Sequence, residues 1–185
     1  DKISACFAFP KRLQIIYGQG HRSGLDIFIT EDKKISMVYL DASGVEGNFF
    51  NIFCLAQFFL ENIEFTVCNG RLSEQIRIQT DTSSCAFFAV DQLCKSGTNP
   101  HFHEEIASKR IQEKDHYSVN PLDLPPSLVR CAQSMTFLGQ YFSHNEGQSL
   151  LAGPVNKKGE TLQKFVASHT QEGISRNGEI KHQNY

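Results

Sequence analysis

One cysteine in the sequence has the surroundings of a nucleophile. Cys85 follows a polar stretch at residues 80–84 and begins an apolar stretch that predicts a buried helix ending near Gly97. The first residue of a helix lies among unpaired backbone N–H groups at the positive end of the helix dipole, which favours the thiolate. Those N–H groups also suit an oxyanion, and Gln79, six residues earlier, is placed to supply a second donor.

A thiolate nucleophile also needs a base, and a histidine oriented by an acid is the usual one. His21 follows the glycines at positions 18 and 20, at the start of one predicted strand, and Asp41 ends the next. Two antiparallel strands joined by a tight turn bring their outer ends together. The sequence therefore predicts that His21 and Asp41 meet at one end of a sheet.

Strand-like segments fill most of the first half of the chain and must position these side chains. Residues 25–30 and 34–40 flank the polar tip Glu31-Asp32-Lys33, the pattern of a β-hairpin. Further strands are predicted at residues 13–17, 63–67 and 75–79, and a buried helix from Asn48 to about Leu60.

The second half of the chain is predicted to be mainly helical. Helices are expected at residues 104–114, at 127–142 after a proline pair, and at 160–169. From Gln171 onward the sequence is polar and rich in Gly and Asn, which is typical of a flexible end.

These elements predict an α/β (α+β) chain in three parts. Residues 1–98 form a catalytic α/β core that carries the His-Asp-Gln-Cys site. Residues 99–170 form a helical regulatory lobe that completes the same domain, and residues 171–185 a flexible tail.

Composition excludes several other classes of protein. The net charge of −2 does not suit a protein that coats nucleic acid, and no apolar run reaches the roughly 20 residues of a membrane-spanning helix. The six cysteines form no C-x-x-C pair, which disfavours a zinc site and a dense disulfide scaffold. His101 and His103 flank Phe102 but have no third ligand at a suitable spacing, so no metal site is predicted.

The order His21, Asp41, Gln79-TDTSS-Cys85 resembles a known clan of cysteine enzymes. This clan CE includes adenovirus-type proteases, SUMO proteases and the YopJ family of bacterial effectors. The similarity is greatest to the YopJ-family acetyltransferases, because two further segments resemble that family: LPPSLVRCAQS at residues 124–134 and VNKKGETL at residues 155–162.

The resemblance implies a papain-like clan CE fold, with a central mixed sheet flanked by helices and a C-terminal helical regulatory annex. It also implies a ping-pong reaction, in which Cys85 takes an acetyl group from acetyl-CoA and passes it to a Ser, Thr or Lys side chain of a host protein. His21 would be the base, Asp41 would orient it, and Gln79 would donate to the oxyanion.

The resemblance further implies activation by inositol hexakisphosphate, a polyanion that several basic side chains must bind. Arg130, Lys157 and Lys158 match the family's basic positions in the two downstream segments. The expected location is a host cell, in the cytoplasm or the nucleus, after secretion from a bacterium. Host proteins are the expected partners, with neither nucleic acid nor a membrane span.

Two other functions are compatible with the same residues. A clan CE cysteine protease that removes ubiquitin or SUMO would use the same His, Asp, Gln and Cys. SUMO proteases usually carry Trp directly after the histidine, whereas Arg22 follows His21 here and the chain has no Trp. The third hypothesis is a binding domain with a decayed site, which the intact set of four residues disfavours.

Overall fold

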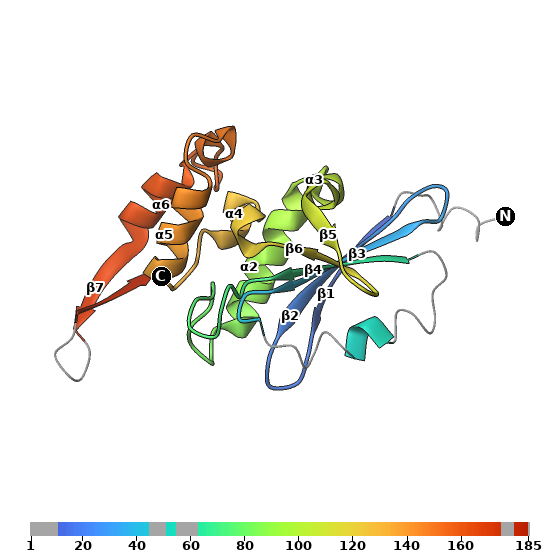
Figure 1. Ribbon diagram of the computed structural model, residues 1–185, viewed down its shortest axis with the longest axis horizontal. Coiled ribbons are helices and arrows are strands. Elements are labelled where there is room, and N and C mark those ends of the chain that lie inside the picture. Colours follow the sequence, from blue (N-terminus) through green and yellow to red (C-terminus); the bar gives the residue numbers. More distant parts are fainter. Residues whose placement is uncertain (1–10, 45–50, 55–62, 175–179, 185) are drawn as a thin grey trace.

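The computed structural model describes residues 11–44, 51–54, 63–174 and 180–184. Within these ranges the chain forms a six-stranded sheet, a separate two-stranded hairpin and a set of helices. Figure 1 shows the sheet at one end of the molecule and helices α5 and α6 at the other, with α2 and α4 between them.

The six-stranded sheet is mixed, with the order β1-β2-β3-β4-β6-β5. Strands β1 to β3 form an antiparallel meander, β4 and β6 add in parallel, and β5 pairs antiparallel with β6. The bounds are β1 (Lys11–Tyr17), β2 (Ser23–Ile29), β3 (Ile35–Asp41), β4 (Ile63–Asn69), β5 (Arg110–Gln112) and β6 (Tyr117–Val119). The predicted strands at residues 13–17, 25–30, 34–40 and 63–67 are confirmed as β1 to β4.

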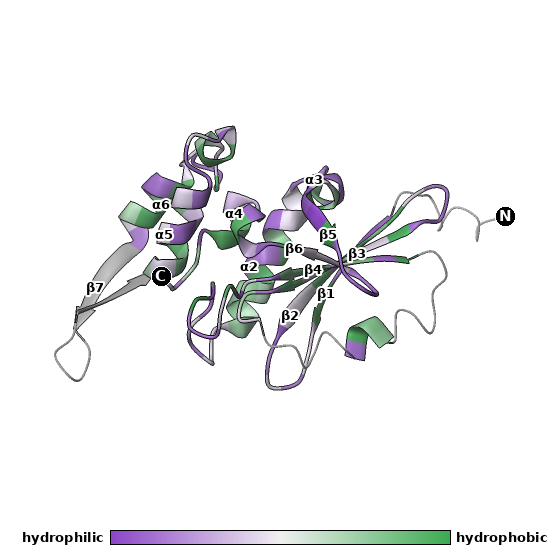
Figure 2. Cartoon of the chain, viewed as in Figure 1, coloured by the Kyte–Doolittle hydropathy of each residue, from purple (hydrophilic) through white to green (hydrophobic). Residues whose placement is uncertain are grey.

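Strand β3 lies in the middle of the core and is buried on both faces. Val38 and Leu40 pack into one apolar cluster, whereas Met37 and Tyr39 pack into a second cluster with Phe53 of a helical stretch at residues 51–54. Side chains of a strand alternate between faces, so burial on both sides explains the continuous apolar run. Figure 2 shows hydrophobic residues along the central strands, whereas the segment of α3 and β5 is largely hydrophilic.

Helix α2 covers the face of the sheet formed by β1, β2 and β3, and it also contacts α4. The helices are α2 (Cys85–Thr98), α3 (Phe102–Lys109), α4 (Pro126–Val129), α5 (Met135–His144) and α6 (Leu162–His169), with 3-10 turns η2 (Pro121–Asp123) and η3 (Ser149–Ala152). The helices predicted from Cys85 and at residues 160–169 are confirmed. Of the helix predicted from Asn48 to Leu60, residues 51–54 are helical and the rest lies outside the described residues.

The predicted strand at residues 75–79 is wrong. The segment turns back on residues 71–73, where Leu72 N–H donates to the Ile76 carbonyl at 2.8 Å, and a single isolated bridge joins Arg71 and Arg77. This excursion begins just beyond the end of β4, and the backbone N–H groups of Ile78 and Gln79 donate to the carbonyls of Gly70 and Ala42, just past the ends of β4 and β3. Gln79 therefore follows a loop and does not end a strand.

Two of the predicted helices are shorter than expected. The helix at residues 104–114 ends at Lys109, because the next residues pair with β6 as strand β5. The helix at residues 127–142 is divided into α4 and α5, because the Ser134 hydroxyl caps α5 by accepting from the Phe137 N–H at 3.1 Å. Strand pairing and capping therefore override the local helical pattern.

Strands β7 (Thr170–Ile174) and β8 (Ile180–Asn184) pair antiparallel, and all but Thr170 lie in the segment predicted to be a flexible tail. Strand pairing does not measure mobility, so the flexible tail stays a prediction, as does the division at residue 98. In the described part of the chain, no helix is long and apolar enough to cross a membrane.

Candidate active site

The β2–β3 hairpin brings His21 and Asp41 together, as the sequence predicts. The outermost pair of the two strands is Gly24 with Leu40, which places the residues just outside it side by side. The turn before β2 needs glycine, because Gly18 and Gly20 have φ angles of 121° and 78°. His21 Nε2 lies 3.0 Å from Asp41 Oδ1 and 2.9 Å from Oδ2.

Asp41 is a buried carboxylate, 2 % exposed, that accepts from a ring of neutral donors. Its Oδ1 accepts from the backbone N–H groups of Ser43 and Gly44 at 2.9 and 3.0 Å, and from the Ser43 hydroxyl at 3.0 Å. The hydroxyls of Ser23 and Tyr39 both lie 3.3 Å from Oδ2. Burial raises the pKa of Asp41, but the hydrogen bonds from His21 and Ser43 outweigh it, and the net pKa is lowered. Asp41 is therefore ionised at neutral pH.

The ionised carboxylate fixes the tautomer of His21. A carboxylate only accepts hydrogen bonds, so the Nε2 atom that faces both of its oxygens carries the proton. In the neutral ring the basic nitrogen is then Nδ1. The His21 side chain is partly exposed, at 19 %.

Cys85 is the first residue of α2 and is 6 % exposed. Its Sγ lies 3.9 Å from the carbonyl oxygen of Gly20, the residue before His21. The predicted position at a helix start is therefore confirmed, and the thiol lies beside the turn that carries the histidine.

Gln79 is buried, at 2 % exposure, and its backbone N–H donates to the Ala42 carbonyl at 2.9 Å. This bond ties the residue to the chain just beyond Asp41. The side-chain Nε2 lies 2.9 Å from the carbonyl oxygen of Asp81 and 3.2 Å from its Oδ1, while the buried Oε1 has no hydrogen-bond partner among the described residues. The prediction did not anticipate Asp81.

The three predicted binders of inositol phosphate lie near one another but differ in their surroundings. Arg130 forms an ion pair with Asp91, donates to the Val155 carbonyl at 3.2 Å and lies over the Phe165 ring. Lys157 and Lys158 are exposed in the turn that follows Val155. Arg130 thus joins the two segments that carry these residues, but Asp91 already neutralises it. Burial lowers the pKa of Arg130, and Asp91 more than offsets this, so the pKa is raised.

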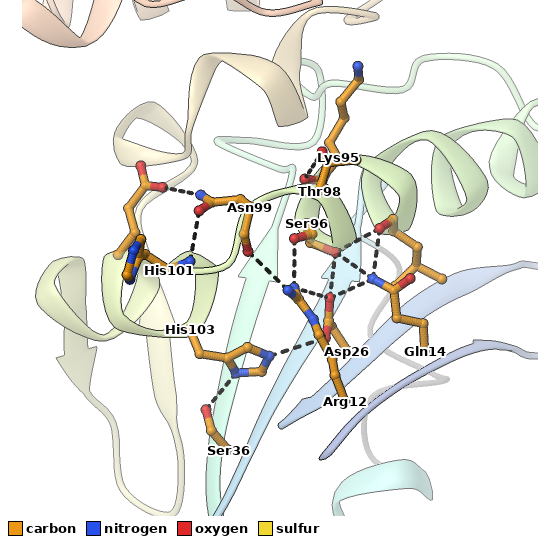
Figure 3. Close-up of polar contacts among 12 residues, drawn as sticks. Arg12, Gln14, Asp26, Ser36, Lys95, Ser96, Thr98, Asn99, His101 and His103 are labelled. Carbon is orange, nitrogen blue, oxygen red and sulfur yellow. Dashed lines mark hydrogen bonds and ion pairs between the residues drawn. The ribbon is translucent and has the colours of Figure 1, made fainter. Parts of the chain in front are cut away.

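The two histidines that flank Phe102 have other partners. His101 pairs with Glu104, while His103 lies 3.1 Å from Asp26 and 2.8 Å from the Ser36 hydroxyl. Figure 3 shows His103 directed toward Asp26, with His101 apart from them. Among the described residues no group of three His, Cys, Asp or Glu side chains could bind a metal ion.

Sequence reasoning missed the residues that support the site. Ser23, Tyr39 and Ser43 surround Asp41, and their only signal is their position at the same strand ends. The loop before Cys85 is organised by Asp81 and Gln133. The signal of Asp81 is an acid three residues before the helix cap Ser84, and that of Gln133 is its place in the segment at residues 124–134 that resembles the family.

Comparison of the fold with solved structures returns proteins of the papain-like α/β class. A deletion variant of AvrA with IP6 and CoA matches at a TM-score of 0.62 and 17 % identity, over 97 % of this chain and 68 % of AvrA. HopZ1a in complex with IP6 and CoA matches at a TM-score of 0.64 and 13 % identity, over 99 % of this chain and 70 % of HopZ1a. The predicted papain-like fold is therefore confirmed.

A match to a family sequence model, and not the fold alone, identifies the family. The family model of the YopJ serine/threonine acetyltransferases matches residues 3–185, and the chain belongs to this family. Comparison with curated protein sequences found no significant match. The resemblance noted in the sequence is thus confirmed over almost the whole chain.

Proposed function

We propose that this protein is an acetyltransferase that moves an acetyl group from acetyl-CoA, through Cys85, to a Ser, Thr or Lys side chain of a host protein. The observation that carries the proposal is the His21–Asp41 pair, which lies beside the turn that contacts the Cys85 thiol. Membership of the YopJ family supports acetyl transfer over proteolysis. CoA in the AvrA and HopZ1a structures supports acetyl-CoA as the co-substrate.

In the first half-reaction the Cys85 sulfur attacks the thioester carbonyl of acetyl-CoA. His21 Nδ1 takes the thiol proton, and Asp41 stabilises the imidazolium that forms. The tetrahedral oxyanion accepts from the Cys85 N–H and from Gln79. When the intermediate collapses, the C–S bond to CoA breaks, His21 returns the proton to the leaving sulfur, and the acetyl group remains on Cys85.

In the second half-reaction an acceptor hydroxyl or amine attacks the acetyl-cysteine. His21 takes the proton of the acceptor as the new bond forms, and the Cys85 sulfur leaves. The balance is one acetyl group moved from sulfur to oxygen or nitrogen, with CoA thiol released. No oxidant or metal ion is needed.

Inositol hexakisphosphate is proposed as an activator, since IP6 is present in the AvrA and HopZ1a structures. Lys157 and Lys158 fit this role because they are exposed and adjacent. Arg130 fits it less well, since a polyanion would have to compete with Asp91 for the guanidinium. The proposed place of action is the host cell, as expected for a bacterial effector of this family.

The test uses isotopically labelled acetyl-CoA, with and without inositol hexakisphosphate. Mass spectrometry should find acetyl on Cys85 and on added acceptor protein, and Cys85→Ala should lose both while it melts at the wild-type temperature. His144→Ala is the matched control, because His144 pairs with Asp123, on elements other than those that carry the site. Cleavage of a ubiquitin or SUMO fusion without any acetylation would favour the protease instead.

A further inference from the structure

The loop between Gln79 and Cys85 is organised by one carboxylate, that of Asp81. Its Oδ1 accepts from the backbone N–H groups of Ser83 and Ser84 at 3.1 and 2.8 Å, and its Oδ2 accepts from the Ser84 hydroxyl at 2.6 Å. Ser84 directly precedes Cys85. The same residue also accepts from Gln79 Nε2, through both its carbonyl oxygen and Oδ1. Asp81 therefore joins the Gln79 amide to the start of helix α2.

Asp81 is in turn oriented by Gln133, which lies between α4 and α5. Gln133 Nε2 donates to Asp81 Oδ2 at 2.6 Å, and its Oε1 accepts from the N–H groups of Thr80 and Asp81 at 2.9 and 3.2 Å. The Gln133 backbone N–H donates to the Ile78 carbonyl at 2.8 Å. Both ends of this amide are thus used by one loop, so the loop depends on a residue more than 50 positions away.

The orientation of Gln79 is imposed by Asp81. Burial raises the pKa of Asp81, but hydrogen bonds from Ser84 and Gln133 lower it to about 2, so the group is an ionised acceptor at neutral pH. Among the described residues Gln79 Oε1 is buried without a partner, and a buried unpaired acceptor is destabilising. Rotating the amide by 180° would direct Oε1 at two acceptor oxygens. The observed orientation is therefore the one that Asp81 selects.

We propose that Asp81, oriented by Gln133, is a positioning residue that aims the Gln79 amide at the oxyanion formed on Cys85. One Nε2 hydrogen is shared between the two Asp81 oxygens, and the second donates to the oxyanion. The inference rests on the proposed function, because it deepens the role of Gln79 in acyl transfer. It predicts that Asp81 and Gln79 act as one unit.

The test is a double-mutant cycle on the full chain, with acylation of Cys85 as the readout. The variants are Gln79→Ala, Asp81→Asn and their combination, and Asp32→Asn at the exposed β2–β3 tip is the matched control. Acylation is followed with acetyl-CoA and with p-nitrophenyl acetate, an activated ester that passes through the same tetrahedral oxyanion. Alkylation of Cys85 by iodoacetamide is measured in parallel, because that displacement forms no oxyanion.

Gln79→Ala is expected to slow acylation about 100-fold, the effect of losing one oxyanion donor. Asp81→Asn should slow it about 10-fold or more, and the double variant should be no slower than Gln79→Ala. Alkylation rates and the KM for acetyl-CoA should stay within about threefold of wild type on the same reasoning. Asp32→Asn should match wild type throughout.

Multiplicative losses in the double variant would overturn the inference, since the two residues would then act independently. Equal losses of acylation and alkylation would also overturn it, because Asp81 would then act on the thiol itself. Acylation by the ester but not by acetyl-CoA would contradict the proposed function, while the cycle on the ester would still decide the role of Asp81. A wild type acylated by neither reagent would contradict both.

Discussion

Two buried carboxylates on the same β-hairpin each contact a histidine, yet their surroundings suit different tasks. Asp41 ends β3 and contacts His21, whereas Asp26 lies within β2, fully buried, and contacts His103. Both carboxyl groups have a lowered pKa despite burial. The difference lies in what else each carboxylate contacts.

Asp26 already has a cation. Arg12 donates to both of its oxygens at 2.8 Å and also to the carbonyls of Ser96 and Asn99 at the end of α2. Figure 3 shows Gln14 and Ser96 converging on the same carboxylate. The cluster thereby fastens the C-terminal end of α2 to strands β1 and β2. Its histidine is bonded at both ring nitrogens, to Asp26 and Ser36.

Asp41 has no comparable cation. Within the described part of the chain no Arg or Lys forms an ion pair with it, and apart from His21 its partners are neutral N–H and O–H donors. In the proposed mechanism, an imidazolium on His21 is the positive charge that this carboxylate stabilises. The comparison separates the two ends of α2. Asp26 fixes its last turn, whereas Asp41 contacts the histidine beside its first residue, the proposed nucleophile.

Replacing each carboxylate by an amide should have different effects at the two sites. The larger effect, on kcat, is expected at Asp41. In Asp41→Asn the two backbone N–H groups keep the amide oxygen in the place of Oδ1, so the amide NH2 faces His21 Nε2. The ring then carries its proton on Nδ1 and no longer accepts one from the thiol. The expected loss of kcat is about 10⁴-fold, as for other triads that lose their orienting carboxylate.

Turnover of labelled acetyl-CoA measures the kcat of Asp41→Asn, and thermal melting shows whether the variant is folded. Asp26→Asn serves as the control, because it leaves the surroundings of His21 unchanged. An Asp41→Asn variant that kept more than about one tenth of the wild-type kcat would show that the carboxylate does not set the tautomer.

For Asp26→Asn the expected effect is on stability. Arg12 and His103 would lose the carboxylate that they share, and breaking a buried pair costs about 3–5 kcal/mol. The lower end is expected because the Arg12 side chain is 21 % exposed. In a chain of this length that corresponds to a Tm lowered by about 6–12 °C. Turnover well below the new Tm should stay near wild type.

The acid side of the stability profile gives a second measurement of Asp26. Its folded pKa lies well below the unfolded value of about 3.9, so its stabilisation is complete above that value and is lost as pH falls through the folded pKa. Denaturant unfolding between about pH 5 and 2 should therefore show a steeper decline in wild type than in Asp26→Asn. Parallel curves would mean that the folded and unfolded pKa values do not differ.

The sequence predicted the site where local rules determine position. A hairpin with a three-residue tip brings its strand ends together whatever packs around it, so His21 and Asp41 were placed correctly. Cys85 was placed by the switch from a polar loop to a helical pattern. The chemical roles of these residues stay proposals.

The sequence did not predict what depends on distant partners. Residues 110–112 pair with β6 although their own pattern is helical, and Gln79 ends a loop whose last two N–H groups donate to the carbonyls of Gly70 and Ala42. The sequence predicts that Arg130 is free to bind an anion, but Asp91, 39 positions earlier, neutralises its guanidinium. No spacing rule connects such residues, because the tertiary fold decides which side chains meet.

The smallest expected effect concerns Tyr39, whose hydroxyl lies 3.3 Å from Asp41 Oδ2. Burial and the nearby Asp41 carboxylate raise its pKa, so the hydroxyl stays protonated and donates to the Ser23 hydroxyl at 2.8 Å. Tyr39→Phe removes this donor and should lower the unfolding free energy by about 1 kcal/mol and kcat about threefold. The control is Asp26→Asn, whose lower Tm shows the effect of a purely structural loss. A loss of kcat above about 100-fold without a lower Tm would contradict this prediction. The Tyr39 hydroxyl would then contact the reacting atoms, and the other neutral donors around Asp41 could not replace it.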